Sequence, residues 1–231
     1  MQTMIDFETR GGTAVISLRN GRLNILTREM HEQLYRHLLR FRRDDSLKVA
    51  VLTSQAGTSF SAGDDLKTIN DDFGEEPDWE ELVMTMPRTK PVVAAVRGHC
   101  VGQGLVYLLM LTDVRFATRD ARFGFPEIRY GYGGAAALTR LAQQIPPTVA
   151  MRLALTGDPM SGEQAAACGL VNEVVDDEQL LEVALAEAEA MATHPQSGLR
   201  AEMIAAARGG LSRSESLALF SHLWDSFPQN P

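Results

Sequence analysis

The chain has 231 residues, 45% hydrophobic and 23% charged, so it can bury a full core and has the composition of a globular protein. A net charge of −8 argues against nonspecific nucleic-acid binding, although local arginines could still hold the phosphates of a ligand. Two cysteines, Cys100 and Cys168, have apolar neighbours that indicate buried, reduced thiols. No apolar run has membrane-spanning length and no secretion leader is visible, which predicts a cytoplasmic protein without a membrane partner.

In the first half of the chain, apolar segments typical of strands alternate with segments whose apolar residues recur at helical spacing. Residues 4–9 and 13–18 alternate apolar and polar side chains around Arg10-Gly-Gly12, which predicts a β-hairpin. Thr27 is a candidate N-cap for a helix in which apolar residues recur up to Phe41. The next predicted elements are a strand at 48–53, an acidic loop at 71–78, a short helix at 79–86, a strand at 91–96 and a helix from Gly102 to about Leu111.

The second half changes from mixed elements to helices. Strands are predicted at 114–117 and 121–125, and helices start near Gly131-Tyr-Gly-Gly134 and Pro146-Pro147. The repeated β-β-α units favour a layered α/β spiral over a Rossmann sheet. We therefore expect a core at 1–190 and a helical region at 191–231, with helices at 178–192, 196–208 and 212–224.

Two glycine-bearing turns each follow an apolar, β-branched run. Phe60-Ser-Ala-Gly-Asp-Asp-Leu-Lys67 comes after Val49-Ala-Val-Leu-Thr53, and Gly98-His-Cys-Val-Gly-Gln-Gly104 comes after Val92-Val-Ala-Ala-Val96. Such junctions can aim two backbone N–H groups at one point and stabilise an oxyanion. Taken singly, the first is better explained as a polar turn with a capping aspartate, and the second is at least as well explained by close packing of a helix on a strand. A dinucleotide fingerprint is excluded, because Tyr107 occupies the place of its third glycine.

Five segments in register carry a resemblance to a known family. They are Arg22-Leu-Asn-Ile-Leu26, the two glycine turns, Phe123-Gly-Phe-Pro-Glu-Ile128 and Met160-Ser-Gly-Glu-Gln-Ala-Ala-Ala-Cys-Gly-Leu-Val-Asn172. In order and spacing they resemble the crotonase (enoyl-CoA hydratase/isomerase) superfamily over about residues 5–220. The resemblance implies a crotonase-type α/β spiral with a C-terminal helical region, an acyl-CoA substrate, no cofactor, and a homotrimer or hexamer. The family's usual last helix is not found before Pro231.

The resemblance also assigns roles to residues. The oxyanion-hole amides would be those of Asp64 and Gln103, the latter a departure because the family commonly has glycine there. The catalytic proton shuttle would be Glu127, which a proline-stiffened aromatic segment places in apolar surroundings that raise a carboxyl pKa. The expected CoA- or substrate-binding positions are Arg22, Leu23, Asn24, Ala62, Gly63, Asp65, Leu66, Gly102, Val106 and Tyr132.

One position bears on the reaction. Hydratases of the family carry a second glutamate one helical turn after the second oxyanion amide, where this chain has Val106. Moving a double bond needs only one base, so Val106 favours isomerisation of 3-enoyl-CoA to 2-enoyl-CoA. The alternatives are a hydratase, another enolate reaction (hydrolysis, decarboxylation or carbon–carbon bond formation), or an acyl-CoA-binding or assembly protein without catalysis.

The remaining candidate residues have structural explanations. Asp113 is expected to pair with a neighbour at a helix-to-strand corner, and His99 is expected to be a structural loop residue. Tyr107 and Tyr130 are expected to pack. No metal-ligand spacing and no G-x-S-x-G motif is present, so neither a metal site nor a serine triad is predicted.

Overall fold

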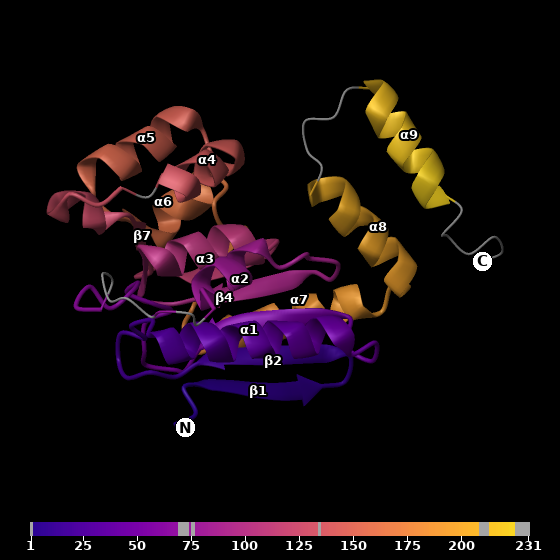
Figure 1. The fold of residues 1–231 in the computed structure, drawn as a ribbon, viewed down its shortest axis with the longest axis horizontal. Helices are drawn as coiled ribbons and strands as arrows, with labels where there is room; N and C mark the ends of the chain where they lie inside the picture. Colours follow the sequence, from indigo (N-terminus) through magenta and orange to yellow (C-terminus); the bar gives the residue numbers. More distant parts are fainter. Residues whose placement is uncertain (1, 69–73, 75–76, 134, 208–212, 225–231) are drawn as a thin grey trace.

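The main element of the fold is a six-stranded sheet in the order β1-β2-β3-β4-β6-β9 (Figure 1). The computed structural model describes residues 2–68, 74, 77–133, 135–207 and 213–224. β1 and β2 form the predicted antiparallel hairpin, and every later strand of this sheet is parallel to its neighbour. The strands are β1 (Ile5–Arg10), β2 (Thr13–Leu18), β3 (Val49–Ser54), β4 (Val92–Val96), β6 (Val114–Thr118) and β9 (Glu173–Val175).

Helices cover both faces of this sheet, which explains why every residue of β3 and β4 is buried. On one face, alternate strand residues such as Ala50 and Leu52 pack with α1 (Arg28–Arg43) and α3 (Gln103–Leu111). On the other, Val49 and Val51 pack against α7 (Leu180–Ala192). The period of two along each strand therefore divides the core into two layers.

A second, three-stranded sheet has the order β5-β7-β8. It consists of β5 (His99–Val101), β7 (Arg122–Gly124) and β8 (Met160–Ser161). β5 begins three positions after β4 ends, so the chain passes from one sheet to the other within the second glycine turn. His99 therefore lies on a strand rather than in a loop. β5 was not predicted because three residues are too few to show a strand period.

Of the remaining helices, α2 (Trp79–Thr85) packs against α1 and α3, whereas the others lie toward the two ends of the molecule (Figure 1). The expected acidic loop at 71–78 lies largely outside the described residues, and Gly134 also lies outside them. Figure 1 shows α9 standing away from the main sheet. No described helix has the length and hydropathy needed to cross a membrane. These helices are α2 (Trp79–Thr85), the 3-10 helix η1 (Pro126–Tyr130), α4 (Ala135–Gln144), α5 (Pro147–Thr156), α6 (Gly162–Ala167), α8 (Gln196–Ala207) and α9 (Arg213–Trp224).

The cysteines differ from one another in burial. Cys100 is fully buried and its thiol contacts the Gly104 carbonyl, whereas Cys168 is only partly buried beside Met160. The expectation of two buried thiols is therefore wrong for Cys168, which lies at the C-terminal end of the short helix α6, where the chain is partly open to solvent.

Candidate active site

The two glycine turns lie against each other. The Ser61 amide donates to the His99 carbonyl (2.8 Å), and the Val101 amide donates back to the Ser61 carbonyl (3.1 Å). These bonds join the turn after β3 to β5 as an isolated parallel bridge between Ser61 and Cys100. The first turn is thereby held beside the N-terminus of α3.

Glycine is required where the turns meet. Gly63 has φ +90°, and a methyl group added there would lie 3.1 Å from the Val101 carbonyl oxygen and 3.4 Å from the Gln103 amide nitrogen. Gly102 has φ +54°, also in the region that favours glycine. The absence of side chains therefore lets the two backbones approach closely.

The amides of Asp64 and Gln103 have no acceptor among the described residues, in contrast to the amides around them. The amides of Gly63 and Asp65 donate to Ser61 Oγ (3.1 Å) and to the Leu26 carbonyl (3.1 Å). Gln103 is the first residue of α3, so its amide has no partner within the helix and lies at the positive end of the helix dipole. The site thus presents two unpaired N–H groups on adjacent segments, the arrangement that stabilises an oxyanion.

Glu127 lies on η1, and its carboxyl is close to the second glycine turn. A methyl group at Gly102 would lie 3.6 Å from Glu127 Oε2, an oxygen that is buried and without a hydrogen-bond partner in the described part of the chain. Burial raises the pKa of Glu127, its own backbone hydrogen bond opposes this rise, and the nearby Asp64 charge adds to it. A half-buried carboxyl with a raised pKa is suited to accept and return a proton.

The expected CoA-path residues divide into buried and exposed ones. Asn24, at φ +45°, is fully buried, and its side-chain amide donates to the Ser59 carbonyl (2.7 Å), so it supports the turn from inside. Leu23 and Leu66 are exposed apolar side chains on the two segments. Arg22 is also exposed, and Ala62 and Asp65 are partly buried. A surface of this kind can bind an extended ligand that lies along it.

Val106 and Tyr132 lie in different surroundings. Val106 is on α3, one turn after Gln103, and is buried in the main core. Tyr132 is exposed beyond η1, and its amide donates to the Glu127 carbonyl (3.2 Å). Val106 is thus a buried apolar side chain on α3, and the Tyr132 ring is open to solvent.

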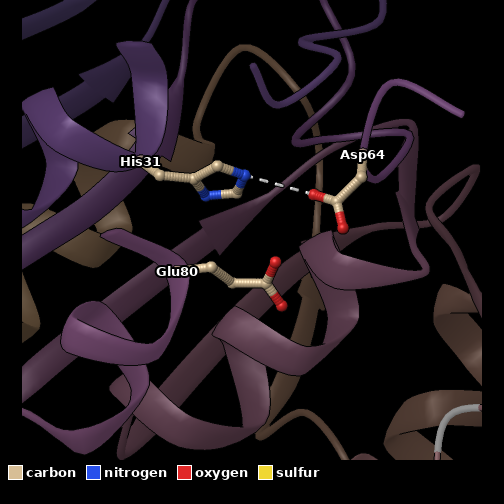
Figure 2. A group of neighbouring side chains, drawn as sticks. All are labelled: His31, Asp64 and Glu80. Atoms are coloured by element: carbon tan, nitrogen blue, oxygen red, sulfur yellow. Dashed lines mark ion pairs between the residues drawn. The ribbon is translucent and has the colours of Figure 1, made fainter. Parts of the chain in front are cut away.

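A cluster of titratable side chains adjoins this site, as Figure 2 shows: His31 from α1, Asp64 from the first turn and Glu80 from α2. His31 Nε2 lies 3.4 Å from Asp64 Oδ1, and ligand atoms of all three residues lie within 4.8 Å of one another. Burial raises the pKa of Glu80 to about 7, the charges of Asp64 and Asp78 add to this rise, and His31 opposes it. A carboxyl with this pKa exchanges its proton readily near neutrality.

Tyr107 on α3 contacts the cluster through His31. Its hydroxyl lies 2.5 Å from His31 Nδ1, and burial raises its pKa above the usual range, so the phenol remains protonated. A phenol that donates to Nδ1 leaves the imidazole proton on Nε2, which faces Asp64. The expectation that Tyr107 packs in the core is confirmed, but it also orients His31.

No sequence motif marks His31 or Glu80 as a site residue. Both lie in helices whose apolar spacing explained the local sequence, and they are 33 and 16 positions from Asp64 along the chain. Within the described residues theirs is the one grouping that could coordinate a cation. The contact of His31 Nε2 with Asp64 Oδ1 already accounts for two of its three members, and we assign it no metal.

The other candidates have structural partners. Asp113 forms an ion pair with Arg88 and accepts a hydrogen bond from the Val92 amide (2.9 Å), as expected for a corner residue. His99 is exposed and its ring contacts Ser59 Oγ (3.2 Å). Tyr130 is exposed, so the expectation that it packs is wrong: it ends η1, with its ring directed outward.

The family model described as "Enoyl-CoA hydratase/isomerase" matches residues 8–219. The chain therefore belongs to the enoyl-CoA hydratase/isomerase (crotonase) family and is an enzyme of that type, acting on acyl-CoA.

Curated relatives differ in the reaction they catalyse. The chain is 32% identical to (E)-benzylidenesuccinyl-CoA hydratase of Thauera aromatica, with 95% of this chain and 88% of the relative covered. It is 35% identical to 1,2-epoxyphenylacetyl-CoA isomerase of Escherichia coli, with 86% and 79% covered. Hydratases and isomerases at similar identity show the family without determining the reaction.

Solved structures agree with the fold. An enoyl-CoA hydratase/isomerase from Mycobacterium paratuberculosis superposes with a TM-score of 0.88 at 28% identity, with 96% of this chain and 90% of that chain covered. An enoyl-CoA hydratase from Mycobacterium tuberculosis gives 0.79 at 28% identity, with 97% and 96% covered. The expected mixed α/β crotonase fold with C-terminal helices is confirmed.

Proposed function

We propose that this enzyme isomerises 3-enoyl-CoA to 2-enoyl-CoA. The observation that carries the proposal is a pair of amides, those of Asp64 and Gln103, that find no acceptor among the described residues. They lie beside the half-buried carboxyl of Glu127, with the apolar Val106 one turn beyond Gln103. The amides supply the charge stabilisation that an enolate requires, and Glu127 supplies one acid–base group.

The reaction proceeds through a dienolate. The Glu127 carboxylate removes a proton from carbon-2, and the electron pair is delocalised over the conjugated system to the thioester oxygen. The amides of Asp64 and Gln103 donate hydrogen bonds to this oxygen, which bears most of the negative charge. Protonation at carbon-4 re-forms the thioester carbonyl and leaves the double bond between carbons 2 and 3.

The CoA moiety is proposed to lie along the two segments that bracket the first turn. The Ala62 amide donates to the Leu23 carbonyl (2.9 Å), which keeps residues 22–26 parallel to residues 62–66. Exposed Arg22 and Leu23 offer a positive charge and an apolar surface at this edge. Such a path combines phosphate attraction with contact to the pantetheine chain.

The test is to measure formation of 2-enoyl-CoA from 3-enoyl-CoA with the Glu127→Gln variant. Loss of the only proposed base is expected to lower kcat by about 10²–10⁴-fold, the usual contribution of a positioned acid–base group. The exposed Glu173→Gln on β9 serves as the matched control and should leave kcat unchanged. Near-normal turnover by Glu127→Gln would remove Glu127 from the mechanism, and rapid hydration of crotonyl-CoA by the native enzyme would identify a hydratase instead.

A further inference from the structure

The carboxyl of Glu80 is not used by a one-base mechanism, although it lies beside the oxyanion site. We propose that Glu80 is the second proton-transfer residue of this enzyme: it protonates carbon-4 while Glu127 deprotonates carbon-2. The inference rests on the proposed isomerase function and replaces its single shuttle by two bases. Because α3 carries Val106, it supplies no second acid to the site. In this proposal the second acid is Glu80, which comes from α2.

Asp64 connects the proposed oxyanion site to Glu80, because its amide is a proposed oxyanion donor and its side chain lies near the Glu80 carboxyl. A thioester oxygen bound to the Asp64 amide would lie about 3 Å from that nitrogen, next to the side chain of the same residue. The Glu80 carboxyl lies within 4.8 Å of the Asp64 carboxylate. Carbon-4 is roughly 4 Å from the thioester carbon, so an acyl chain directed toward α2 brings it to Glu80.

Two contacts fix the position of helix α2 and therefore of the Glu80 backbone. The Asp78 side chain caps α2 by accepting from the Glu81 amide (2.9 Å), and the Trp79 ring packs on Tyr35 of α1 with centroids 5.7 Å apart. In the described part of the chain, the Glu80 carboxyl has no hydrogen bond and no ion pair. A half-buried polar group without a partner is free to meet a substrate.

The charges around Glu80 favour its protonated form. Asp64 and Asp78 act on it with negative charge, Tyr107 nearby is a neutral phenol, and His31 is the one group of the cluster that favours ionisation. Asp64 raises the pKa of Glu80 and of Glu127 alike, so it is within electrostatic range of both carboxyls. Glu127 can therefore start the reaction ionised, as the base, and Glu80 can start it protonated, as the acid.

Each turnover then balances as follows. The Glu127 carboxylate takes a proton from carbon-2, and the Glu80 carboxylic acid gives its proton to carbon-4. The product is 2-enoyl-CoA, with Glu127 protonated and Glu80 ionised. Proton exchange with water restores both residues, since each is only partly buried.

The experiment follows deuterium from carbon-2. A 3-enoyl-CoA carrying two deuterium atoms at carbon-2 is converted in ordinary water, and the product is analysed by mass spectrometry for deuterium at carbon-4. If Glu127 and Glu80 each transfer one proton, the native enzyme should move no deuterium from carbon-2 to carbon-4. Glu80→Gln is expected to lower kcat about 100-fold, to lose the fall of kcat above pH 7, and to transfer measurable deuterium, because Glu127 must then deliver the proton itself.

Matched variants separate this role from a structural one. Glu81→Gln, the exposed neighbour on the same helix, should match the native enzyme in rate, pH profile and isotope content. Substantial transfer by the native enzyme, or an unchanged rate and pH profile in a folded Glu80→Gln variant, would overturn the second base and leave the isomerase assignment standing. Isomerisation absent from the native enzyme would refute the proposed function itself. Activity that is lost on chelation and regained with a divalent cation would assign the cluster to a metal and also overturn the inference.

Discussion

At the scale of single residues, the proposed chemistry depends on carboxyls held partly out of water. Glu127 and Glu80 come from different elements, and burial is the largest cause of the raised pKa of each. Both are destabilised as carboxylates, which is the condition under which a carboxyl transfers protons near neutral pH. Such sites cost folding free energy where the charge must be buried.

This cost yields a stability prediction for Glu80→Gln. A folded-state pKa raised from 4.5 to about 7 favours folding of the protonated form, so this contribution is present at pH 4 and is lost as the pH rises through 7. Removing the charge should therefore leave stability unchanged at pH 4 and increase it at pH 8. After allowance for solvent screening, we expect a gain of about 1–2 kcal/mol.

The measurement is thermal or urea unfolding of both proteins at the two pH values. Glu81→Gln, whose side chain is exposed, should show no such difference between pH 4 and pH 8. Equal stability of Glu80→Gln and the native protein at pH 8 would show that the Glu80 carboxylate carries no burial cost.

At the scale of elements, the site depends on how closely α3 approaches the first turn. A methyl group at Gly104 would lie 2.8 Å from Ser61 Cβ and 2.9 Å from the Ser61 carbonyl oxygen. The G-x-G sequence can therefore serve both helix–strand packing and oxyanion geometry. Gly104 permits the close contact of α3 with Ser61, and Gly102 forms the turn before the Gln103 amide.

We therefore predict that Gly104→Ala impairs both stability and catalysis. Relief of the clash must move α3 away from Ser61 and displace the Gln103 amide. The expected loss is about 1–3 kcal/mol of unfolding free energy, together with a lower kcat. Gly198→Ala is the control, because Gly198 lies in α8 with no atom within 4 Å of the added methyl, and it should be neutral or slightly stabilising. Full activity of Gly104→Ala would show that the amide position is tolerant.

At the scale of the whole molecule, the C-terminal helices are packed differently from the core. α7 is part of the layer that covers the main sheet, whereas α9 stands away from it (Figure 1). Leu217 in α9 is 59% exposed although it is a large apolar residue. We propose that residues 191–231 mediate assembly into a trimer or a dimer of trimers, which would cover such side chains.

The corresponding prediction concerns mass in solution. Sedimentation should give about three or six times the 25.3 kDa of one chain. Leu217→Lys should weaken assembly by placing a charge at the contact. Leu155→Lys, at an exposed leucine of α5, is the control and should keep the native mass. A monomeric native protein would refute the proposed assembly.

Much of the fold could be predicted because its elements are locally encoded. The hairpin, the Thr27 cap of α1 and the apolar β3 and β4 were all predicted to within two residues. Of the short elements, β7 was predicted within residues 121–125, whereas β5, β9 and η1 were not, because runs of three to five residues rarely establish a period. For the candidate site, Asp64, Gln103 and Glu127 were named from motifs, and the structure brings their segments together.

The sequence by itself determined the family, the α/β spiral and the residues of the two turns, since glycine, proline and apolar period act over a few neighbouring positions. Only the tertiary structure decided which amides remain unpaired, because that depends on every neighbouring acceptor. It also decided that His31, Asp64 and Glu80 share one site. Their proximity results from packing α1 and α2 over the first turn, a contact between distant segments that no local pattern encodes.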